Sequence, residues 1–390
     1  MIQITDKSQC CGCTACASIC AHDAITMQSD KEGFLYPIVN VDICTNCGLC
    51  ETVCPIIYRN GMELHPNQKA LYAARHRDKE VLMDSSSGGA FWALAELVIK
   101  KGGVVCGVEY SPNMEVRHAF AETLEDCKRF MGSKYVQSNV NGIYPQIKTY
   151  LKNNRYVLFV GTPCQVEGLN LYLRKSYDTL ITADLVCHAV PSPLIFREYI
   201  SFVNKKMKAN LSAIDMRYKR ICGWSHRFSY RYSFDTCKSI CDPSNISNWG
   251  RLYFSRLIDR PSCHECKFTN YHRSGDFTLA DFWDDAHKRP DLYSSDGTSL
   301  FLVNSEKGMN WLAELSENLN LWSITPEEAW QPCLEKATIK APLREQFWID
   351  YNRKGFSFVY RKYFTDSYKT RLKRQIRWTL KFIGLWKRNK

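Results

Sequence analysis

The sequence lacks any long apolar run. Nowhere in its 390 residues do eighteen apolar residues follow one another, which excludes a hydrophobic stretch able to span a bilayer. Residues 1–7 contain no basic region followed by an apolar segment, so we expect no secretory signal and a reducing, cytoplasmic setting. A Ser-His-Asp order, an HExxH motif and a P-loop are also missing, which leaves hydrolysis and phosphoryl transfer without residues to perform them.

The basic charge is concentrated at one end. Residues 361–390 carry eleven Lys or Arg and a single acid, Asp366, within a chain whose net charge is +12. The other residues are nearly neutral, which argues against a basic groove for nucleic acid. Apolar side chains fall on one helical face of this tail (Leu372, Ile376, Leu380, Ile383 and Trp386), opposite Arg374, Arg377 and Lys381. This pattern predicts peripheral contact with the inner membrane face, the alternative being a helix docked on protein.

Cysteine is abundant: nine of the 19 cysteines lie between Cys10 and Cys54. They form two runs, Cys10-x2-Cys13-x2-Cys16-x3-Cys20 and Cys44-x2-Cys47-x2-Cys50-x3-Cys54-Pro55. This is the spacing of two-cluster bacterial ferredoxins, in which the fourth cysteine of each run ligates the other cluster. We therefore predict two [4Fe-4S] clusters, one on Cys10, Cys13, Cys16 and Cys54 and the other on Cys20, Cys44, Cys47 and Cys50.

Two alternatives fit these runs less well. Disulfides are not expected in a chain without an export signal, and zinc ligands come in pairs rather than in triplets with a distant fourth. The runs also depart from the ferredoxin pattern at two positions. Ala21 replaces the proline expected after Cys20, and Cys11 is an additional thiol. We expect Cys11 to be a spectator, because its use would break the spacing to Cys13.

The length predicts more than a ferredoxin. We divide the chain into an α+β ferredoxin domain (1–60), a linker rich in turn formers (61–69), an α/β domain with a mixed sheet (70–345) and a helical basic tail (346–390). Within the α/β domain, strands and helices alternate, which predicts a sheet with helices on both faces. The clearest units are strands at 156–160 and 180–186, a helix at about 90–100, and a helix that follows the segment 161–165 and ends near Leu173.

A third metal site is predicted in this domain. Cys164 and Cys187 each follow a predicted strand, and ligands gather outside the carboxyl ends of strands in such sheets. With the Cys263-x2-Cys266 pair they supply four thiols, enough for a third [4Fe-4S] cluster. The alternatives are buried free thiols, or a zinc site that combines Cys263 and Cys266 with Cys237 and Cys241. We interpret Cys106, Cys127, Cys222 and Cys333 as core or incidental cysteines.

Further motifs surround these cysteines. They are Ser86-Ser87-Gly88-Gly89, Gly132-Ser133-Lys134-Tyr135-Val136-Gln137-Ser138, Gly161-Thr162-Pro163-Cys164-Gln165, Asp184-Leu185-Val186-Cys187-His188, Arg260-Pro261-Ser262-Cys263-x2-Cys266 and Asp281-Phe282-Trp283. With the double cysteine run, they make the chain resemble the beta subunits of coenzyme F-420 hydrogenases and dehydrogenases, which are iron-sulfur flavoproteins. That family includes chlorophyll-modifying reductases and relatives encoded among polysaccharide-biosynthesis genes. Ala189 and Ala280 stand where the family usually has glycine.

The resemblance implies a bound FAD. It implies cofactor contacts from Ser86, Ser87, Gly88, Gly89, Ser133, Lys134, Tyr135, Gln137, Ser138, Gly161, Thr162 and Asp281. The residues themselves support part of this, because a Gly-rich helix start offers free N–H groups to a diphosphate, although an ordinary N-capped loop has the same composition. Lys134 is a candidate to neutralise the flavin, or a solvated lysine. His188 is a candidate proton donor, or a strand-end cap.

Two functions follow from these expectations. The first is an oxidoreductase in which electrons pass between the clusters and FAD, and the flavin reduces or oxidises a small organic substrate, such as one of polysaccharide biosynthesis. Its partner would be an electron donor or acceptor protein, or a reduced cofactor. The second is a non-catalytic electron-transfer subunit that docks a partner oxidoreductase. The fold class alone fixes neither the substrate nor the direction of electron flow.

Overall fold

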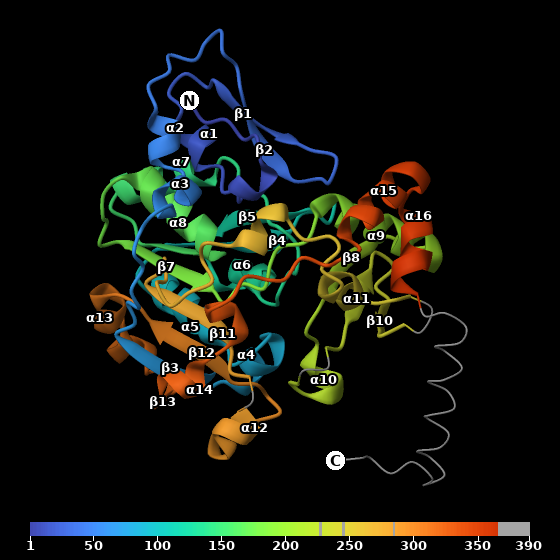
Figure 1. Cartoon of the computed structure of the whole chain (residues 1–390). Coiled ribbons are helices and arrows are strands. Elements are labelled where there is room, and N and C mark those ends of the chain that lie inside the picture. The colour runs from blue at the N-terminus through green and yellow to red at the C-terminus, as the bar shows by residue number, and fades with distance from the viewer. Residues whose placement is uncertain (226–227, 244–245, 284, 366–390) are drawn as a thin grey trace, which may run out of the picture.

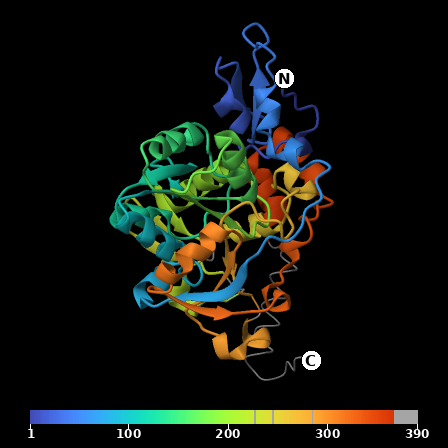
Figure 2. The ribbon, with the colours of Figure 1, turned by 90° about the vertical axis from the view of Figure 1, so that its left-hand side faces the viewer.

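A computed structural model of the chain describes residues 1–225, 228–243, 246–283 and 285–365. It shows a small N-terminal unit at one end of a larger sheet domain, with a mainly helical lobe beside the sheet (Figure 1). A view turned by 90° shows the N-terminal unit capping the same end (Figure 2). No helix in these residue ranges is long and apolar enough to cross a membrane. The predicted amphipathic face at 372–386 lies outside the described residues.

The N-terminal unit is an α+β structure, as the sequence predicts. Its elements are η1 (Lys7–Gln9), α1 (Ala15–Ile19), β1 (Ile25–Ser29), β2 (Leu35–Val39), α2 (Leu49–Thr52) and α3 (Pro55–Arg59). Strands β1 and β2 form an antiparallel hairpin, whose turn is closed by the Asp30 carboxylate accepting the N–H groups of Glu32 and Phe34. Helix α3 begins at Pro55, whose fixed φ suits the first helical position.

The large domain is built on one mixed sheet. Its strands are β3 (Ala70–His76), β4 (Val104–Tyr110), β5 (Val116–Ala121), β6 (Val157–Gly161), β7 (Leu180–Leu185), β11 (Phe277–Asp281), β12 (Ser299–Val303) and β13 (Leu319–Ser323). They lie in the order β13-β3-β12-β11-β7-β6-β4-β5. The pairs β4–β6, β6–β7 and β7–β11 are parallel and the others antiparallel, so the predicted mixed α/β fold is confirmed.

Helices cover both faces of this sheet. On one face, α5 (Ala90–Lys100) and α13 (Glu306–Leu315) pack over Leu158. On the other, α7 (Ile143–Lys152) and α8 (Pro163–Leu173) pack over Phe159 and share their core with the N-terminal unit. The shorter elements are α4 (Lys79–Asp84), α6 (Leu124–Cys127), η2 (Lys128–Phe130), η3 (Pro261–Glu265), α12 (Asp285–Lys288), η4 (Pro290–Leu292), α14 (Pro326–Ala329) and η5 (Pro332–Leu334). Strand β6 is apolar without alternation because both of its faces are buried.

The lobe beside the sheet has its own core. It contains α9 (Pro193–Met207), β8 (Leu211–Asp215), α10 (Lys219–Cys222), β9 (Arg231–Phe234), β10 (Ser239–Cys241), α11 (Trp249–Phe254), α15 (Arg344–Lys354), α16 (Phe356–Val359) and the π-helical η6 (Tyr360–Phe364). Phe347, Trp348 and Tyr360 pack in the same core as α9 and β8. The division that assigned everything after 345 to a tail is therefore corrected: the chain up to Phe364 completes this lobe.

Other differences from the predicted elements are local. The sequence predicts a helix from about Gly308 to Leu319, whereas α13 ends at Leu315 and β13 follows it on the edge of the sheet. The alternation of aromatic residues from Ile214 to Phe234 predicts strands, but this segment also includes the helical turn α10 between β8 and β9. Helix α5 has the predicted bounds.

Candidate iron–sulfur site

One set of four ferredoxin cysteines surrounds a single depression. Cys20, Cys44, Cys47 and Cys50 line a hollow of about 370 Å³ on the N-terminal unit. Three of them come from the second run, whereas Cys20 is the last cysteine of the first run. This is the crossed set that the spacing predicts. Cys47 is exposed, so this hollow faces the outside of the protein.

The second set is more deeply placed. Burial, and after it the neighbouring Cys10 and Cys54 thiols, raise the pKa of Cys16 to about 12. Burial also raises the pKa of Cys54, with smaller contributions from Cys10 and Cys50. Cys54 at the end of the second run thus lies among thiols of the first. Because thiols must lose their protons to bind iron, cluster assembly at these buried positions releases protons.

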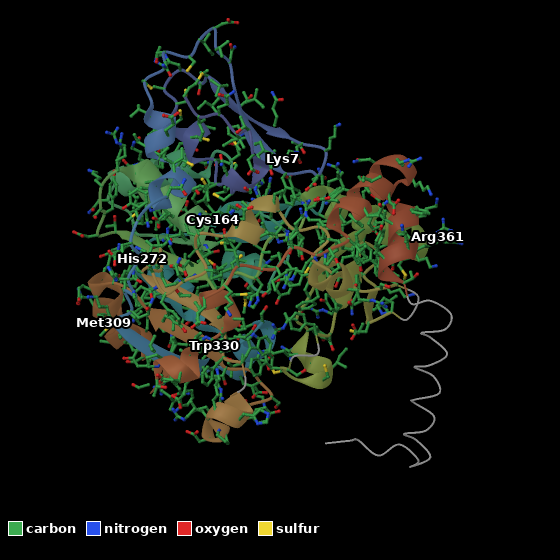
Figure 3. All side chains as sticks on the ribbon, viewed as in Figure 1. Lys7, Cys164, His272, Met309, Trp330 and Arg361 are labelled. Carbon is green, nitrogen blue, oxygen red and sulfur yellow. The ribbon has the colours of Figure 1, made fainter. Side chains whose placement is uncertain are left out.

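The cysteines predicted for a third cluster also meet. A cavity of about 560 Å³ is lined by Cys164, Cys187, Cys263 and Cys266. Cys164 follows β6 and Cys187 follows β7, and these two strands are parallel neighbours, which brings their carboxyl ends to one edge of the sheet. Cys164 lies between the N-terminal unit, marked by Lys7, and the sheet (Figure 3). The cavity thus brings the two strand ends together with the Cys263-x2-Cys266 pair (the Cys263 knuckle), as the sequence predicts.

Cys11 has a place that the sequence did not predict. It is buried, lines the same cavity, and its thiol interacts with those of Cys13 and Cys164. Cys11 thus joins a ferredoxin loop to the wall of the cavity predicted for the third cluster (the third cavity), whereas its absence from the ferredoxin ligand sets stays a prediction. Packing of α8 against α1 makes this possible: a Cβ on Gly168 would lie only 3.0 Å from Cys13. The extra thiol was visible in the sequence, but its partner was not.

The donor chemistry of this cavity suits a cluster better than zinc. Its walls hold five thiols, whereas Cys237 and Cys241 are exposed and do not line it. Among the described residues, no three Cys, His, Asp or Glu side chains converge closely enough for a single metal ion. A cubane cluster instead takes thiolates spaced around a wider cavity. The zinc alternative built on Cys237 and Cys241 is therefore wrong.

A buried ion pair holds the frame of the cavity. Asp184, at the end of β7, accepts hydrogen bonds from Arg273 Nη2 at 2.8 Å, Thr278 Oγ at 2.7 Å and the Ser274 and Gly275 N–H groups at 3.0 Å. Arg273 in turn donates to the carbonyl of Phe268, which lines the cavity. Asp184 is 0% exposed, so its charge depends on these partners.

The residues predicted to contact FAD fall into two groups. In the first, Ser133 donates its N–H to Ser86 Oγ at 2.7 Å, which joins two motifs far apart in the sequence. Lys219 donates to the Ser87 carbonyl at 2.8 Å, and Arg217 binds the Asp281 carboxylate through both oxygens at 2.8 and 3.1 Å. Lys219 and Arg217 were not predicted from the sequence, where neither stands in a recognisable motif. Burial lowers the pKa of Lys219 to about 7.

The second group lies beside the iron–sulfur cavity. Gln137 donates to the Cys11 carbonyl at 3.0 Å, and Ser138 Oγ accepts from Gln165 at 3.1 Å. Thr162 Oγ is 3.2 Å from Cys164 Sγ and lines the cavity directly, next to Gly161 at the end of β6. These residues contact the segments that carry Cys11 and Cys164 rather than the loop of residues 86–89 (the Ser86 loop). They are therefore placed to shape the third cavity.

The structure gives two predicted residues other partners. Lys134 donates to the carbonyls of Arg129, Met131 and Gly132, which occupies its three N–H donors, and burial lowers its pKa to about 7. His188 Nδ1 is 3.0 Å from Cys333 Sγ, and burial lowers its pKa. In the structure, both side chains thus contact other groups of the protein. Cys333, which was interpreted as incidental, is the partner of His188.

The two glycines of the Ser86 loop are explained by packing. A Cβ on Gly88 would lie 2.2 Å from the Ala74 carbonyl, and one on Gly89 would lie 2.8 Å from His76 Cβ. Gly89 also adopts φ +80°, a conformation that favours glycine. Both glycines therefore seat the start of α5 against β3. The loop itself stands at the same edge of the sheet as Asp281, because the end of β3 and the end of β11 both meet the start of β12.

Comparison with known proteins agrees with this architecture. Residues 9–56 match the family model of the 4Fe-4S dicluster domain, and the fold and thiol arrangement thus define an iron–sulfur electron-transfer protein. Residues 154–328 match the model for the C terminus of the coenzyme F420 hydrogenase/dehydrogenase beta subunit. These matches confirm the predicted resemblance to coenzyme F420 hydrogenase/dehydrogenase beta subunits, the second of them over a little under half of the chain.

Individual relatives are distant. The F subunit of the F(420)H(2) dehydrogenase from Methanosarcina mazei is 22% identical over 178 residues, which is 43% of this chain. The match spans half of that relative's length. A chain of the F420-reducing [NiFe] hydrogenase complex from Methanosarcina barkeri superimposes with a TM-score of 0.45 at 18% identity, over 75% of this chain and 94% of that one.

Proposed function

We propose that this protein is an iron–sulfur flavoprotein oxidoreductase that passes electrons between its ferredoxin-type clusters and FAD to reduce or oxidise a small organic substrate. The observation that carries the proposal is the five-thiol cavity. Cys11 extends from the ferredoxin unit into a wall otherwise formed by Cys164, Cys187, Cys263 and Cys266 at the edge of the sheet. A site at this position continues the two ferredoxin sites into the large domain.

The residues of the cavity fit a third [4Fe-4S] cluster. Cys164, Cys187, Cys263 and Cys266 would hold it, and when bound it supplies one-electron chemistry. The chain itself excludes water with Ile56 and Phe268, and Thr162 places a hydroxyl at 3.2 Å from Cys164 Sγ. Hydrogen bonds to cluster sulfurs and restricted solvent access are the means by which a protein sets cluster potentials.

The Ser86 loop is the site that we propose for FAD. It begins α5, whose N-cap Gly89 has no side-chain cap, and the loop is joined to Ser133. An uncapped helix start of this length favours a phosphate group. Lys219, which is buried beside the Ser87 carbonyl, adds a nearby amine. FAD would supply two-electron exchange with the substrate there, and the chain would bind and orient it.

A second candidate function is electron transfer to a docked catalytic partner. Cys47, which lines the hollow formed by the second cysteine run and Cys20, is exposed. Val41 and Ile43, close to it in sequence, are exposed as well. Turnover of a substrate by the purified chain with dithionite as donor supports the enzyme, whereas flavin reduction without any product supports the carrier. The metabolite that accumulates in a deletion strain, including intermediates of polysaccharide biosynthesis, identifies the substrate.

The third cluster predicts an iron content. Three [4Fe-4S] clusters give about twelve irons and twelve acid-labile sulfides per chain, and Cys263→Ala should lower both to about eight. The matched control is Cys241→Ala, which removes an exposed cysteine outside the cavity and should leave about twelve. Eight irons in the reconstituted wild-type chain would contradict the third cluster. Iron and sulfide are measured per chain by colorimetry.

The flavin site predicts a stoichiometry. Mass spectrometry of the cofactor released from the purified chain should identify FAD at about one per chain. Ser133→Tyr should lower the flavin content severalfold, since the bulky ring would displace the Ser86 loop from its 2.7 Å contact. Ser212→Tyr, at an exposed position on β8, is the control and should retain the flavin. Release of FMN, or full flavin content in Ser133→Tyr, would contradict this site.

A further inference from the structure

Arg260 is a buried cation at the boundary between the ferredoxin unit and the third cavity. It is 0% exposed and lines the cavity together with Cys11 and Cys164. No carboxylate in the described part of the chain pairs with it. An unpaired charge is costly to bury, which points to an anionic partner at this position.

The contacts of Arg260 fix its guanidinium against the first ferredoxin loop. Nε donates to the Cys10 carbonyl at 2.7 Å, and Nη2 donates to the Leu35 carbonyl at 2.9 Å and lies 3.5 Å from Cys10 Sγ. Nη1 donates to Gln137 Oε1 at 2.9 Å. The side chain also lies over the ring of Tyr36, with 4.5 Å between Cζ and the ring centroid.

The loop leaves space for this group. Gly12 has φ +71°, and a Cβ there would lie 2.6 Å from Arg260 Nη1. Every side chain larger than glycine would displace the guanidinium from between Cys10 and the cavity. The glycine between Cys11 and Cys13 is thus required for the arginine as well as for the turn.

Two other buried arginines join the ferredoxin unit to the rest of the chain, and both have a counter-charge. Arg59 pairs with Glu167 at 3.3 Å, and Arg344 pairs with Glu32. Their charges are therefore neutralised locally. Arg260 differs because the groups beside it that can become negative are cysteine sulfurs and the Tyr36 hydroxyl. Of these, the Cys10 sulfur lies 3.5 Å from Nη2 and is a predicted cluster ligand, so it would be a thiolate in the assembled cluster.

We propose that Arg260 is a positioning residue that sets the potential of one ferredoxin cluster. Its charge would stabilise the reduced form of the inner cluster, which is the one on Cys10, Cys13, Cys16 and Cys54. Reduction adds one negative charge to this cluster, whose Cys10 sulfur lies close to the guanidinium. The outer cluster, on Cys20, Cys44, Cys47 and Cys50, has no buried arginine or lysine among the described residues that line its hollow; Met1 lines it, but its ammonium is exposed and is paired with Glu51 at 3.1 Å. The inner cluster therefore has the higher potential, which directs electrons toward the third cavity. This direction rests on the proposed function, whereas the effect on potential needs only the two ferredoxin clusters.

The test is a redox titration of the holoprotein followed by EPR, in which the outer cluster is the internal reference. Arg260→Gln should lower the equilibrium constant for reducing the inner cluster at least tenfold, which is about 59 mV for a one-electron couple, and should leave the outer cluster unchanged. Arg260→Lys should restore most of the shift because it keeps the charge. The matched control combines Arg59→Gln with Glu167→Gln, which removes a buried ion pair of the same unit without leaving a charge, and should move neither potential.

Equal shifts of both clusters, or no shift with both clusters assembled, would overturn the proposal. If the clusters do not assemble in Arg260→Gln, the proposal is tested instead on the wild-type chain labelled with ¹⁵N-arginine. Pulsed EPR should then show ¹⁵N coupling to one reduced cluster only, and this coupling should disappear in Arg260→Lys. A wild-type chain without such a coupling would also overturn it. A chain without FAD would refute the proposed function and leave both of these measurements valid.

Discussion

Replacing Cys10 and Cys54 together by alanine is expected to remove one ferredoxin cluster and leave the other intact. The two residues belong to different runs, but the predicted crossed arrangement would make them ligands of the same cluster. Cys20, Cys44, Cys47 and Cys50 keep their hollow in this variant. Iron should fall by about four per chain, and one of the two ferredoxin-type [4Fe-4S] EPR signals should remain.

The reciprocal pair provides the control. Cys10→Ala with Cys20→Ala removes two cysteines of the same run, and in the crossed arrangement this damages both clusters, so about eight irons should be lost. In an uncrossed arrangement the two double variants would exchange their results. The pair of experiments therefore decides the ligand sets without a need to compare absolute yields. Electron entry from a ferredoxin or dithionite donor should be lost in the second variant.

Replacing Asp184 by alanine is expected to cost about 3–5 kcal/mol of folding free energy. The substitution leaves Arg273 buried and without its counter-charge, and it also removes the acceptor for the Ser274 and Gly275 N–H groups and for Thr278 Oγ. Since Arg273 supports the Phe268 carbonyl in the cavity wall, we expect loss of the third cluster at temperatures where the ferredoxin clusters persist.

Thermal unfolding followed by circular dichroism, with iron content measured in parallel, tests this expectation. The control is Asp291→Ala, which breaks the Arg289–Asp291 pair at 2.7 Å on the protein surface. Exposed pairs of this kind contribute about 0–1 kcal/mol, so its unfolding midpoint should stay close to that of the wild type. A midpoint of Asp184→Ala equal to that of Asp291→Ala would show that the buried network does not hold this part of the fold.

The ferredoxin ligands could be predicted because their chemistry is encoded in local spacing. Each loop places its thiols by the number of residues between them, and this does not depend on the remaining chain. The meeting of Cys164 with Cys187 was predictable for a similar reason, since both follow parallel neighbouring strands. The catalytic roles of Lys134 and His188 stay predictions. Lys134 donates to backbone carbonyl groups, and His188 lies beside Cys333.

The class of this protein follows from its amino-acid order alone, because two cysteine runs and the α/β alternation define a dicluster unit joined to a mixed sheet. What lies between these two parts depends on the way they dock. Cys11 and Arg260 are 249 positions apart, and only the docking of the ferredoxin loop on α8 and on the Cys263 knuckle places them in one cavity wall. The same holds for Phe347 and Tyr360, which were predicted to belong to a tail but fill the core of the lobe. Local spacing encodes ligands, whereas contacts between distant segments depend on how complete surfaces pack.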